Sequence, residues 1–487
     1  MSKMTPFPFQ RHDLNVLRQA NYVALLNLQT GAGKTPLTTW AMQESGARVS
    51  LVICPTQTME SAWKPTVSDI MGVEAREIGN SNKAKQAAMR DFRFGSAGVY
   101  LVSPQLLTRS DISDWSGDFL AIDEAHTLMT PKSKGQRKLS GYVARDGEPL
   151  AARFQGRLAL SATSFRNRFE LAWSYGRTLW PEYDGRGELA DYNFVQWQYD
   201  RMDYKSVYTN RRDHNGNPIQ VKQFLGEKNP GQWISECPTV ITHFKRERCC
   251  DFHNMGFLPT DEPVERNEVI TLLPEQKKAV RELQASMLTY IEDNPMVCDI
   301  PLTAAQRVRQ VTLATPTLTY DEDDKLSVSF SDDANSPYLD RLLELLENEI
   351  EGETCAVYTE SQKYAAVVVK RLNQAGITAF EYSGATRKDR DDNLKLFGTK
   401  YRVMVGVLAA AGTGLDSMQK VCKNEVWLSR DLDETVNIQA MGRLDRLSGI
   451  GQVMRWIFHD DLGISENRYG EAIARRLELN KSLRTVA

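Results

Sequence analysis

The chain has 487 residues, of which 41% are apolar and 25% charged, and its net charge is -3 with a pI near 6.2. This charge argues against a protein that coats nucleic acid through bulk positive charge, although a local basic groove can still bind nucleic acid. No run of about 18 apolar residues is present, so we expect no membrane-spanning helix. The length is too great for one compact core and indicates two or three domains.

The thiols and the first residues indicate a reducing compartment. The seven cysteines are scattered along the chain, which fits free thiols rather than a disulfide framework. Residues 1–10 contain no apolar stretch of the signal-peptide type. We therefore expect a cytoplasmic protein.

Short apolar runs alternate with polar, helix-compatible segments in the first part of the chain. Continuous apolar runs of this length are typical of strands that are buried on both faces of a parallel sheet. The pattern predicts an α/β fold built from βαβ units. The predicted strands are residues 22–26, 49–53, 99–102, 119–122 and 158–160.

A phosphate-binding loop is predicted directly after the first strand. Its residues are Thr30, Gly31, Ala32, Gly33, Lys34 and Thr35. Glycines allow backbone N–H groups to approach phosphates, and the helix that follows adds positive potential at its N-terminus. Lys34 can reach the β and γ phosphates of ATP, and the Thr35 hydroxyl can bind Mg²⁺. Leu28 stands where the general pattern has its first glycine, and Pro36 lies in the first helical turn, where a missing N–H is tolerated.

A pair of acids follows the strand at 119–122. A strand that delivers an acid from its carboxyl end places the carboxylate at the ligand edge of a parallel sheet. We expect Asp123 to hold Mg²⁺ and Glu124 to position and activate the attacking water.

The middle of the chain, residues 181–335, is too long for a bare loop, and we expect a mostly helical insertion with one hairpin. Residues 192–212 mix aromatic and basic side chains, and Asn215-Gly216 is a hairpin-turn signal. Either this element protrudes and contacts DNA through Arg211 and Arg212, or its aromatics pack on the first domain. An amphipathic helix is predicted over 274–292, and the acidic stretch 321–324 precedes the domain boundary.

A loose cluster of possible metal ligands lies in the same segment. Zinc is one interpretation of this cluster, but the spacing fits no common zinc finger, and adjacent cysteines suit one tetrahedral site poorly. The cluster comprises Cys237, His243, Cys249, Cys250 and His253.

A second set of apolar runs predicts a second parallel sheet at 355–358, 403–405, 426–428 and 456–458. Arg443 and Arg446 follow the third of these runs and are three residues apart, so on a helix they would share a face. A cation that is supplied from a separate domain can stabilise the charge on a transferring γ-phosphate only when the domains close. The pair therefore predicts a link between ATP occupancy and domain closure.

Together these motifs resemble a superfamily 2 helicase, most closely the Swi/Snf-type DNA translocases. Gly451-Gln452 come later after the last arginine than is usual in that branch, which leaves the subfamily open. The compact size is similar to bacterial or bacteriophage members. The motifs that carry the resemblance are Phe9-Gln10, Cys54-Pro55-Thr56 with Trp63, residues 102–107, Ser161-Ala162-Thr163 with Arg166-Asn167, Tyr382-Ser383-Gly384, residues 411–416 and residues 439–446.

The resemblance implies two RecA-like lobes, 1–180 and 336–487, that close on one ATP with Mg²⁺ as cofactor. It implies that Gln10 reads adenine, that Gly414 and Asp416 contribute to the ATP site, and that Gln439 acts beside the two arginines. It also implies nucleic-acid contacts, which motors make to phosphates rather than to base edges. The residues implied in those contacts are Thr56, Ser103, Thr163, Ser383 and Thr413.

The expected activity is that of a monomeric ATPase that moves along double-stranded or branched DNA. Three alternatives stay open: a strand-separating or branch-migrating helicase, an ATP-gated clamp that does not turn over, and a motor directed at RNA. The complete set of phosphate-loop, acidic and arginine residues argues against the clamp.

Overall fold

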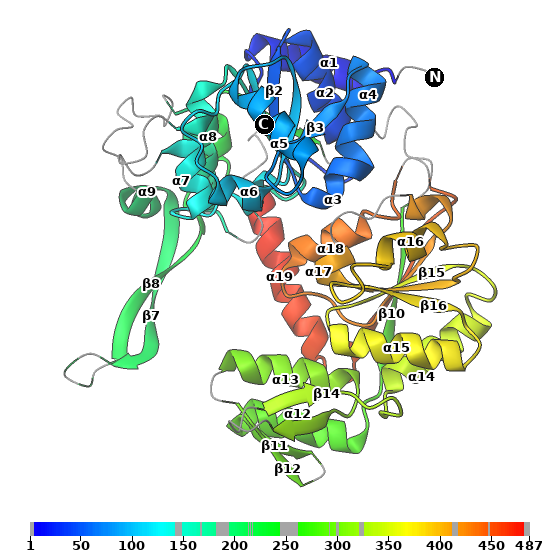
Figure 1. The fold of residues 1–487 in the computed structure, drawn as a ribbon. Coiled ribbons are helices and arrows are strands. Elements are labelled where there is room, and N and C mark those ends of the chain that lie inside the picture. Colours follow the sequence, from blue (N-terminus) through cyan, green and yellow to red (C-terminus); the bar gives the residue numbers. More distant parts are fainter. Residues whose placement is uncertain are drawn as a thin grey trace. The chain divides into compact units, whose positions relative to one another are not determined.

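The computed structural model describes residues 4–141, 149–165, 168–181, 194–212, 214, 216, 218–243, 262–291, 293–298, 301–320, 326–411, 417–446 and 449–481. The chain divides into two compact units, Met1–Phe257 with Ala474–Ala487, and Leu258–Ile473. Each unit contains one parallel sheet with helices on both faces (Figure 1). The predicted α/β class with two parallel sheets is confirmed.

The sheet of the first unit has seven strands in the order β3-β4-β2-β5-β6-β1-β9, all parallel. All five predicted strands are present, and two further strands, β3 and β9, lie at the edges of the sheet. In sheet order the strands are β3 Ala75–Glu77, β4 Gly98–Val102, β2 Val49–Ile53, β5 Phe119–Ile122, β6 Gly156–Ser161, β1 Val23–Leu28 and β9 Val240–His243.

Helices connect these strands and cover the sheet. They are α1 Pro8–Gln19, α2 Lys34–Glu44, α3 Thr56–Thr58, η1 Met59–Trp63, α4 Lys64–Met71, α5 Lys83–Arg93, α6 Pro104–Arg109, η2 Ala125–Thr127, α7 Lys134–Ser140, η3 Leu150–Arg153, α8 Leu171–Leu179, α9 Phe194–Arg201 and α10 Gln232–Glu236. A separate two-stranded hairpin, β7 Met202–Arg212 and β8 Pro218–Glu227, follows α9.

Continuous apolar strands are buried here because both faces of the sheet are covered. Every residue of β1 is buried. Leu25 packs into the hydrophobic core on one face, while its neighbour Leu26 packs into the core on the other face. Since successive side chains of a strand point to opposite faces, an unbroken apolar run is the pattern that a two-sided core requires.

The second unit has a six-stranded parallel sheet in the order β10-β19-β18-β15-β17-β16. Its strands are β10 Val264–Ile270, β19 Met454–Asp460, β18 Asn424–Trp427, β15 Cys355–Thr359, β17 Val403–Val407 and β16 Ala379–Tyr382. Its helices are α12 Pro274–Ser286, α13 Pro301–Leu313, α14 Pro337–Asn348, α15 Gln362–Gln374, α16 Arg390–Lys395, α17 Leu408–Ala411, η4 Met418–Lys420 and α18 Glu434–Met441. Helix α19 Ile464–Lys481 begins in this unit, and from Ala474 onward its residues belong to the first unit.

Helices α12 and α13 form a small subdomain with two hairpins. The hairpins are β11 Leu288–Ile291 with β12 Asn294–Val297, and β13 Thr317–Tyr320 with β14 Leu326–Ser329. The subdomain has a hydrophobic core of its own, which includes Val280, Leu283, Met296 and Val308.

The middle segment differs from the expected helical insertion. It contains three hairpins, supplies β9 to the first sheet and supplies β10 to the second sheet. The two units consequently divide at residue 257, whereas the sequence places lobe boundaries at 180 and 336. The helix expected over 274–292 ends at Ser286, because Met287 adopts a left-handed conformation (φ 57°) and strand β11 follows. The acidic stretch 321–324 lies outside the described residues.

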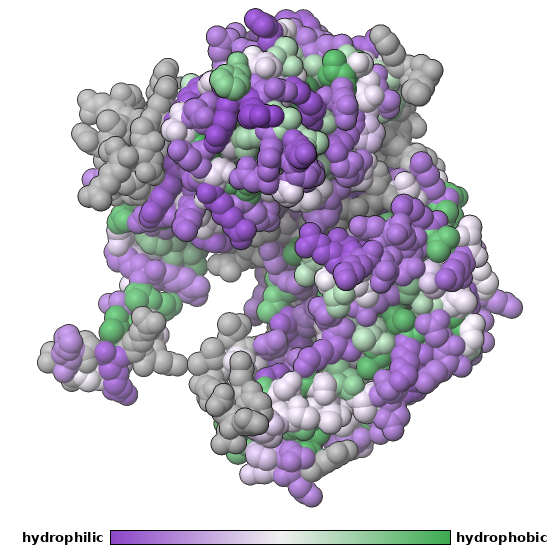
Figure 2. Space-filling view, viewed as in Figure 1, coloured by the Kyte–Doolittle hydropathy of each residue, from purple (hydrophilic) through white to green (hydrophobic). Residues whose placement is uncertain are grey.

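Three further features concern the surface, the helices and the cysteines. The face in Figure 2 is mostly hydrophilic. Within the described ranges, no helix combines the length and the apolar character needed to cross a membrane. The described cysteines, Cys54, Cys237, Cys298, Cys355 and Cys422, are free thiols.

Candidate active site

The loop between β1 and α2 has the backbone geometry of a phosphate cradle. Gly31 (φ 84°) and Gly33 (φ 78°) adopt left-handed conformations that glycine reaches without steric strain. The Lys34 ammonium donates a hydrogen bond to the carbonyl oxygen of Leu28 at 2.8 Å, so it folds back over the loop. The first N–H groups of a helix have no intrahelical acceptor, and α2 therefore directs donors and positive potential at this loop.

Gln10 lies against this loop. Its side chain is buried, and its Oε1 accepts a hydrogen bond from the Phe7 N–H at 3.0 Å. A Cβ atom added at Gly33 would collide with Gln10 Nε2. The structure thus brings the predicted adenine-reading glutamine to the phosphate loop.

A pair of side chains that the sequence did not reveal ties α1 to the sheet. His243, the last residue of β9, lies with Nε2 2.8 Å from Asp13 Oδ2 and 3.0 Å from Oδ1. Its carbonyl oxygen accepts a hydrogen bond from the Gln29 N–H at 3.1 Å, at the start of the phosphate loop. Asp13 and Gln10 both belong to α1, three residues apart. The Asp13–His243 contact therefore holds the helix that carries Gln10.

This contact gives His243 a role other than zinc binding. Cys249, Cys250 and His253 lie outside the described residues. Within the part of the chain that the structure describes, no group of three or more His, Cys, Asp or Glu could hold a metal ion.

Asp123 is buried at the carboxyl end of β5. Its Oδ2 accepts a hydrogen bond from the Trp63 indole N–H at 2.9 Å. Burial and then the nearby Glu124 carboxylate raise the pKa of Asp123 to about 6, against the lowering effects of the Trp63 hydrogen bond and the Lys34 charge. A divalent cation would relieve the repulsion between the two carboxylates. The donor set of Asp123, Thr35 and nucleotide phosphates therefore fits Mg²⁺.

Glu124 begins a chain of contacts that links two strand ends. Its backbone is left-handed (φ 47°), a strained conformation that is common at functional sites. Its Oε2 lies 3.4 Å from His126 Nδ1, which in turn lies 2.9 Å from Ser161 Oγ. Ser161 Oγ also accepts a hydrogen bond from the Thr163 N–H at 3.0 Å. The acids after β5 are thereby connected to the Ser-Ala-Thr segment at the end of β6.

The nucleic-acid candidates of the first unit lie at the same edge of the sheet. Thr56 is exposed at the start of α3, just after β2. Ser103 is half-buried after β4, and its hydroxyl caps α6 by accepting from the Leu106 N–H at 3.2 Å. Thr163 follows β6, and its buried hydroxyl makes no hydrogen bond to a described residue. Because parallel strands end at one edge, these residues share that edge with the phosphate loop and the acids.

The second unit places its predicted residues around α18. Gln439 is buried in this helix. The expectation that Arg443 and Arg446 share a helical face is wrong, because α18 ends at Met441 and both arginines lie in the turns that follow. Arg446 Nε donates to the Gly442 carbonyl oxygen at 3.1 Å, which holds this turn.

Ser383 follows β16 in the second unit. It is buried, its hydroxyl donates to the Glu381 carboxylate, and it accepts from the Ala385 N–H at 3.1 Å. These bonds organise the turn itself. Three further predicted residues, Thr413, Gly414 and Asp416, lie outside the described residues.

The predicted hairpin is present, and its aromatic residues divide into buried and exposed members. Phe194 and Trp197 are buried and pack beside Trp173 and Phe169 of the first unit. Tyr199 and Tyr204 are exposed at the base of the hairpin, and Lys222 lies over both rings, 4.3 and 4.2 Å from their centroids. Further residues at this element are Tyr208, which is 73% exposed, and Arg212, which is exposed and donates to the Gly216 carbonyl oxygen at 2.6 Å.

The side chain of Arg211 and the residue Asn215 lie outside the described part of the chain. Strands β7 and β8 pair with each other and, among the described strands, with no other. Figure 1 shows them as a separate ribbon beyond α9.

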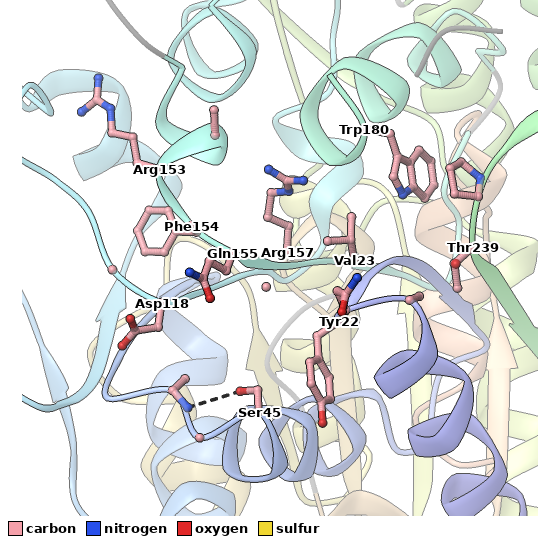
Figure 3. A pocket seen from close by; sticks show the side chains of 18 residues that line it. Tyr22, Val23, Ser45, Asp118, Arg153, Phe154, Gln155, Arg157, Trp180 and Thr239 are labelled. Carbon is pink, nitrogen blue, oxygen red and sulfur yellow. Dashed lines mark hydrogen bonds between the residues drawn. The ribbon is translucent and has the colours of Figure 1, made fainter. Parts of the chain in front are cut away.

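A hollow of about 1000 Å³ lies at the opposite edge of the first sheet, where the strands begin (Figure 3). Its walls include Tyr22 before β1, Asp118 before β5 and Thr239 before β9, together with Arg157 and Trp180. The length of the strands separates this hollow from the phosphate loop. It is therefore not part of the candidate ATP site.

No protein-family model matches the chain, and no curated protein matches it. Among solved structures, the Sulfolobus solfataricus SWI2/SNF2 ATPase core in complex with dsDNA is 16% identical with a TM-score of 0.40, over 99% of this chain and 97% of that chain. The Sulfolobus solfataricus SWI2/SNF2 ATPase core domain is 17% identical with a TM-score of 0.37, over 99% and 93% of the two chains.

Proposed function

We propose that this chain is an ATP-dependent nucleic-acid motor, specifically a translocase on double-stranded DNA. One observation carries the proposal: the edge of the first sheet that presents the phosphate loop and the two acids also presents the exposed segment after β2. Nucleotide chemistry and nucleic-acid contact can therefore be coupled within one rigid sheet.

The residues of the first unit have distinct roles in this proposal. The loop N–H groups and Lys34 hold the phosphates, and Gln10, which lies beside this loop, contacts the adenine base. Thr35 and Asp123 hold Mg²⁺, which when bound neutralises charge on the β and γ phosphates. Glu124 orients the attacking water, and His126, 3.4 Å from its carboxylate, holds Glu124 in place.

Arg443 and Arg446 supply positive charge from the second unit when the units close on the nucleotide. Arginines in this role increase phosphoryl-transfer rates by about 10³ to 10⁵. Gln439, Gly414 and Asp416 belong to the same proposed surface, and Ser383 and Thr413 to the proposed nucleic-acid contacts. Hydrolysis reverses closure, which moves one unit along the phosphate backbone relative to the other.

A second candidate function is strand separation or branch migration. The hairpin β7–β8 favours it, because a paired ribbon with exposed aromatic and basic side chains can enter a DNA junction. Unbranched double-stranded DNA would be enough to stimulate the ATPase activity of a translocase. The ATPase activity of a branch-migrating enzyme would respond most strongly to branched DNA.

The test is a parallel measurement of ATPase rate with no nucleic acid, single-stranded DNA, double-stranded DNA, branched DNA and RNA. We expect the largest stimulation with double-stranded DNA. Displacement of a triplex-forming strand without unwinding of a forked duplex would identify a translocase. An unstimulated or absent ATPase activity would contradict the proposal.

A further inference from the structure

A single helical stretch joins the proposed nucleic-acid edge to the interior of the first unit. It begins at Thr56 with α3, continues through the π-helical turn η1 and ends with α4 at Met71. Thr56 is exposed, whereas Trp63, the last residue of η1, is completely buried. A π-helical turn contains one extra residue and changes the direction of the side chains that follow it, and such turns are frequent at functional sites.

Trp63 makes a specific polar contact inside this core. Its indole N–H donates to Asp123 Oδ2 at 2.9 Å. The other carboxylate oxygen, Oδ1, accepts from the Glu124 N–H at 3.0 Å. One oxygen is thus held by the backbone of the acidic segment itself, and the other is held by the helical stretch that begins at the nucleic-acid edge.

We infer that Trp63 is a positioning residue through which nucleic acid bound at the start of α3 acts on the Mg²⁺-binding carboxylate of Asp123. This inference rests on the proposed function. A shift of α3 moves the indole, and the indole rotates the carboxylate to which it is hydrogen-bonded. The rigid ring transmits small displacements because Trp63 packs in a dense core with Met59, Val67 and Cys54.

The simpler interpretation is that Trp63 only fills the core. Trp115 provides the comparison, because it is also completely buried in the first unit. Its indole N–H makes no hydrogen bond to a described residue. If burial of the ring were the whole role of Trp63, removing the N–H at either position would have the same effect on the ATP site.

The experiment deletes the N–H and keeps the ring. Trp63 is replaced by β-(3-benzothienyl)alanine, in which sulfur occupies the N–H position, and also by phenylalanine (Trp63→Phe). The same replacements at Trp115 are the matched controls. The affinity for β,γ-imido-ATP with Mg²⁺ is measured with and without a DNA duplex, and the ratio of the two is the coupling factor. Stimulated and basal ATPase rates are measured beside it.

We expect the duplex to tighten analogue binding about tenfold in the wild-type protein, and the ratio to fall to about one in the Trp63 variants. The Trp115 variants keep the wild-type ratio. An unchanged ratio in the Trp63 benzothienyl variant would overturn the inference while leaving the proposed function in place. A wild-type protein that neither hydrolyses ATP nor responds to DNA would overturn both.

A second measurement decides the matter if the substituted proteins do not fold. The ¹H–¹⁵N indole resonance of Trp63 is followed in the wild-type protein while duplex DNA is added. We expect it to shift, and the Trp115 resonance to stay in place. A Trp63 resonance that is insensitive to bound DNA would exclude transmission through this hydrogen bond.

Discussion

The side-chain amide of Gln10 lies directly against the backbone of Gly33, where a Cβ atom would collide with Gln10 Nε2. Gly33→Ala is therefore expected to displace Gln10 from the phosphate loop. It also introduces a side chain at φ 78°, which costs about 1–2 kcal/mol of folding stability. We expect the affinity for a fluorescent ATP analogue to fall by about tenfold or more, because the contact groups are misplaced.

Gly46→Ala is the matched control for this variant. Gly46 has φ 72°, but a Cβ there would meet nothing within 4 Å. Both variants place a side chain at a left-handed backbone position, so both should lose stability in urea. Only the change at Gly33 should weaken ATP binding. Equal ATP affinity in the two variants would show that the approach of Gln10 to Gly33 has no role in nucleotide binding.

Two substitutions separate nucleotide binding from hydrolysis. Lys34→Ala removes the ammonium that lies over the loop, and we expect it to abolish hydrolysis. Glu124→Gln keeps the shape of the side chain but removes the proposed water-orienting carboxylate, so hydrolysis is lost while ATP still binds. Single-turnover hydrolysis and equilibrium binding distinguish the two effects. Glu74→Gln, at an exposed position of the same unit, should leave both unchanged.

The sheets could be predicted from the sequence because burial on both faces leaves a local signal. A strand such as β1 has only buried residues, so it appears as an unbroken apolar run. The phosphate loop and the acids were predictable for a related reason, since each follows such a run directly. The edge strand β9 was not predicted, because its four residues carry no such run and it joins the sheet through pairing with β1.

The contacts between distant segments could not be predicted. Trp63 and Asp123 are 60 residues apart in sequence, and Asp13 and His243 are 230 apart. No periodic pattern in the sequence indicates either contact, because tertiary packing alone brings these side chains together. The wrong helical placement of Arg443 arose similarly: spacing of three residues fits a helix, but α18 has already ended at Met441.

The proposed closing mechanism predicts a large kinetic effect at Arg443. Arg443→Ala should lower the DNA-stimulated turnover about a thousandfold while changing ATP affinity little, because the guanidinium acts on charge that develops in the transition state. Arg266→Ala, which removes a half-exposed guanidinium of the same unit, should be close to wild type. Near-normal turnover in the Arg443 variant would contradict a catalytic contribution from the second unit.

The Asp13–His243 pair predicts a link between the stability of the first unit and ATP binding. His243→Ala leaves the buried Asp13 carboxylate without its 2.8 Å donor and should lower the free energy of unfolding by about 2 kcal/mol. ATP affinity should fall too, since α1 carries Gln10. Adding Asp13→Asn to His243→Ala removes the unpaired charge and should restore part of the stability in urea denaturation. No recovery in the double variant would argue against an uncompensated carboxylate as the cause.

The hairpin predicts a measurable share of the DNA affinity. If Arg211 and Arg212 contact phosphates, replacing both with alanine should weaken duplex binding and lower the DNA-stimulated ATPase rate, with no change in the basal rate. Each phosphate contact that is lost should reduce the slope of log affinity against log salt concentration by about 0.9. Lys278→Ala, which removes an exposed charge from α12 in the other unit, controls for a general loss of positive charge.

An unaltered salt slope and an unaltered DNA-stimulated rate in the double variant would remove the hairpin from the DNA-binding surface. A selective loss with branched DNA would instead favour strand separation, because a junction is the substrate that a paired ribbon can enter.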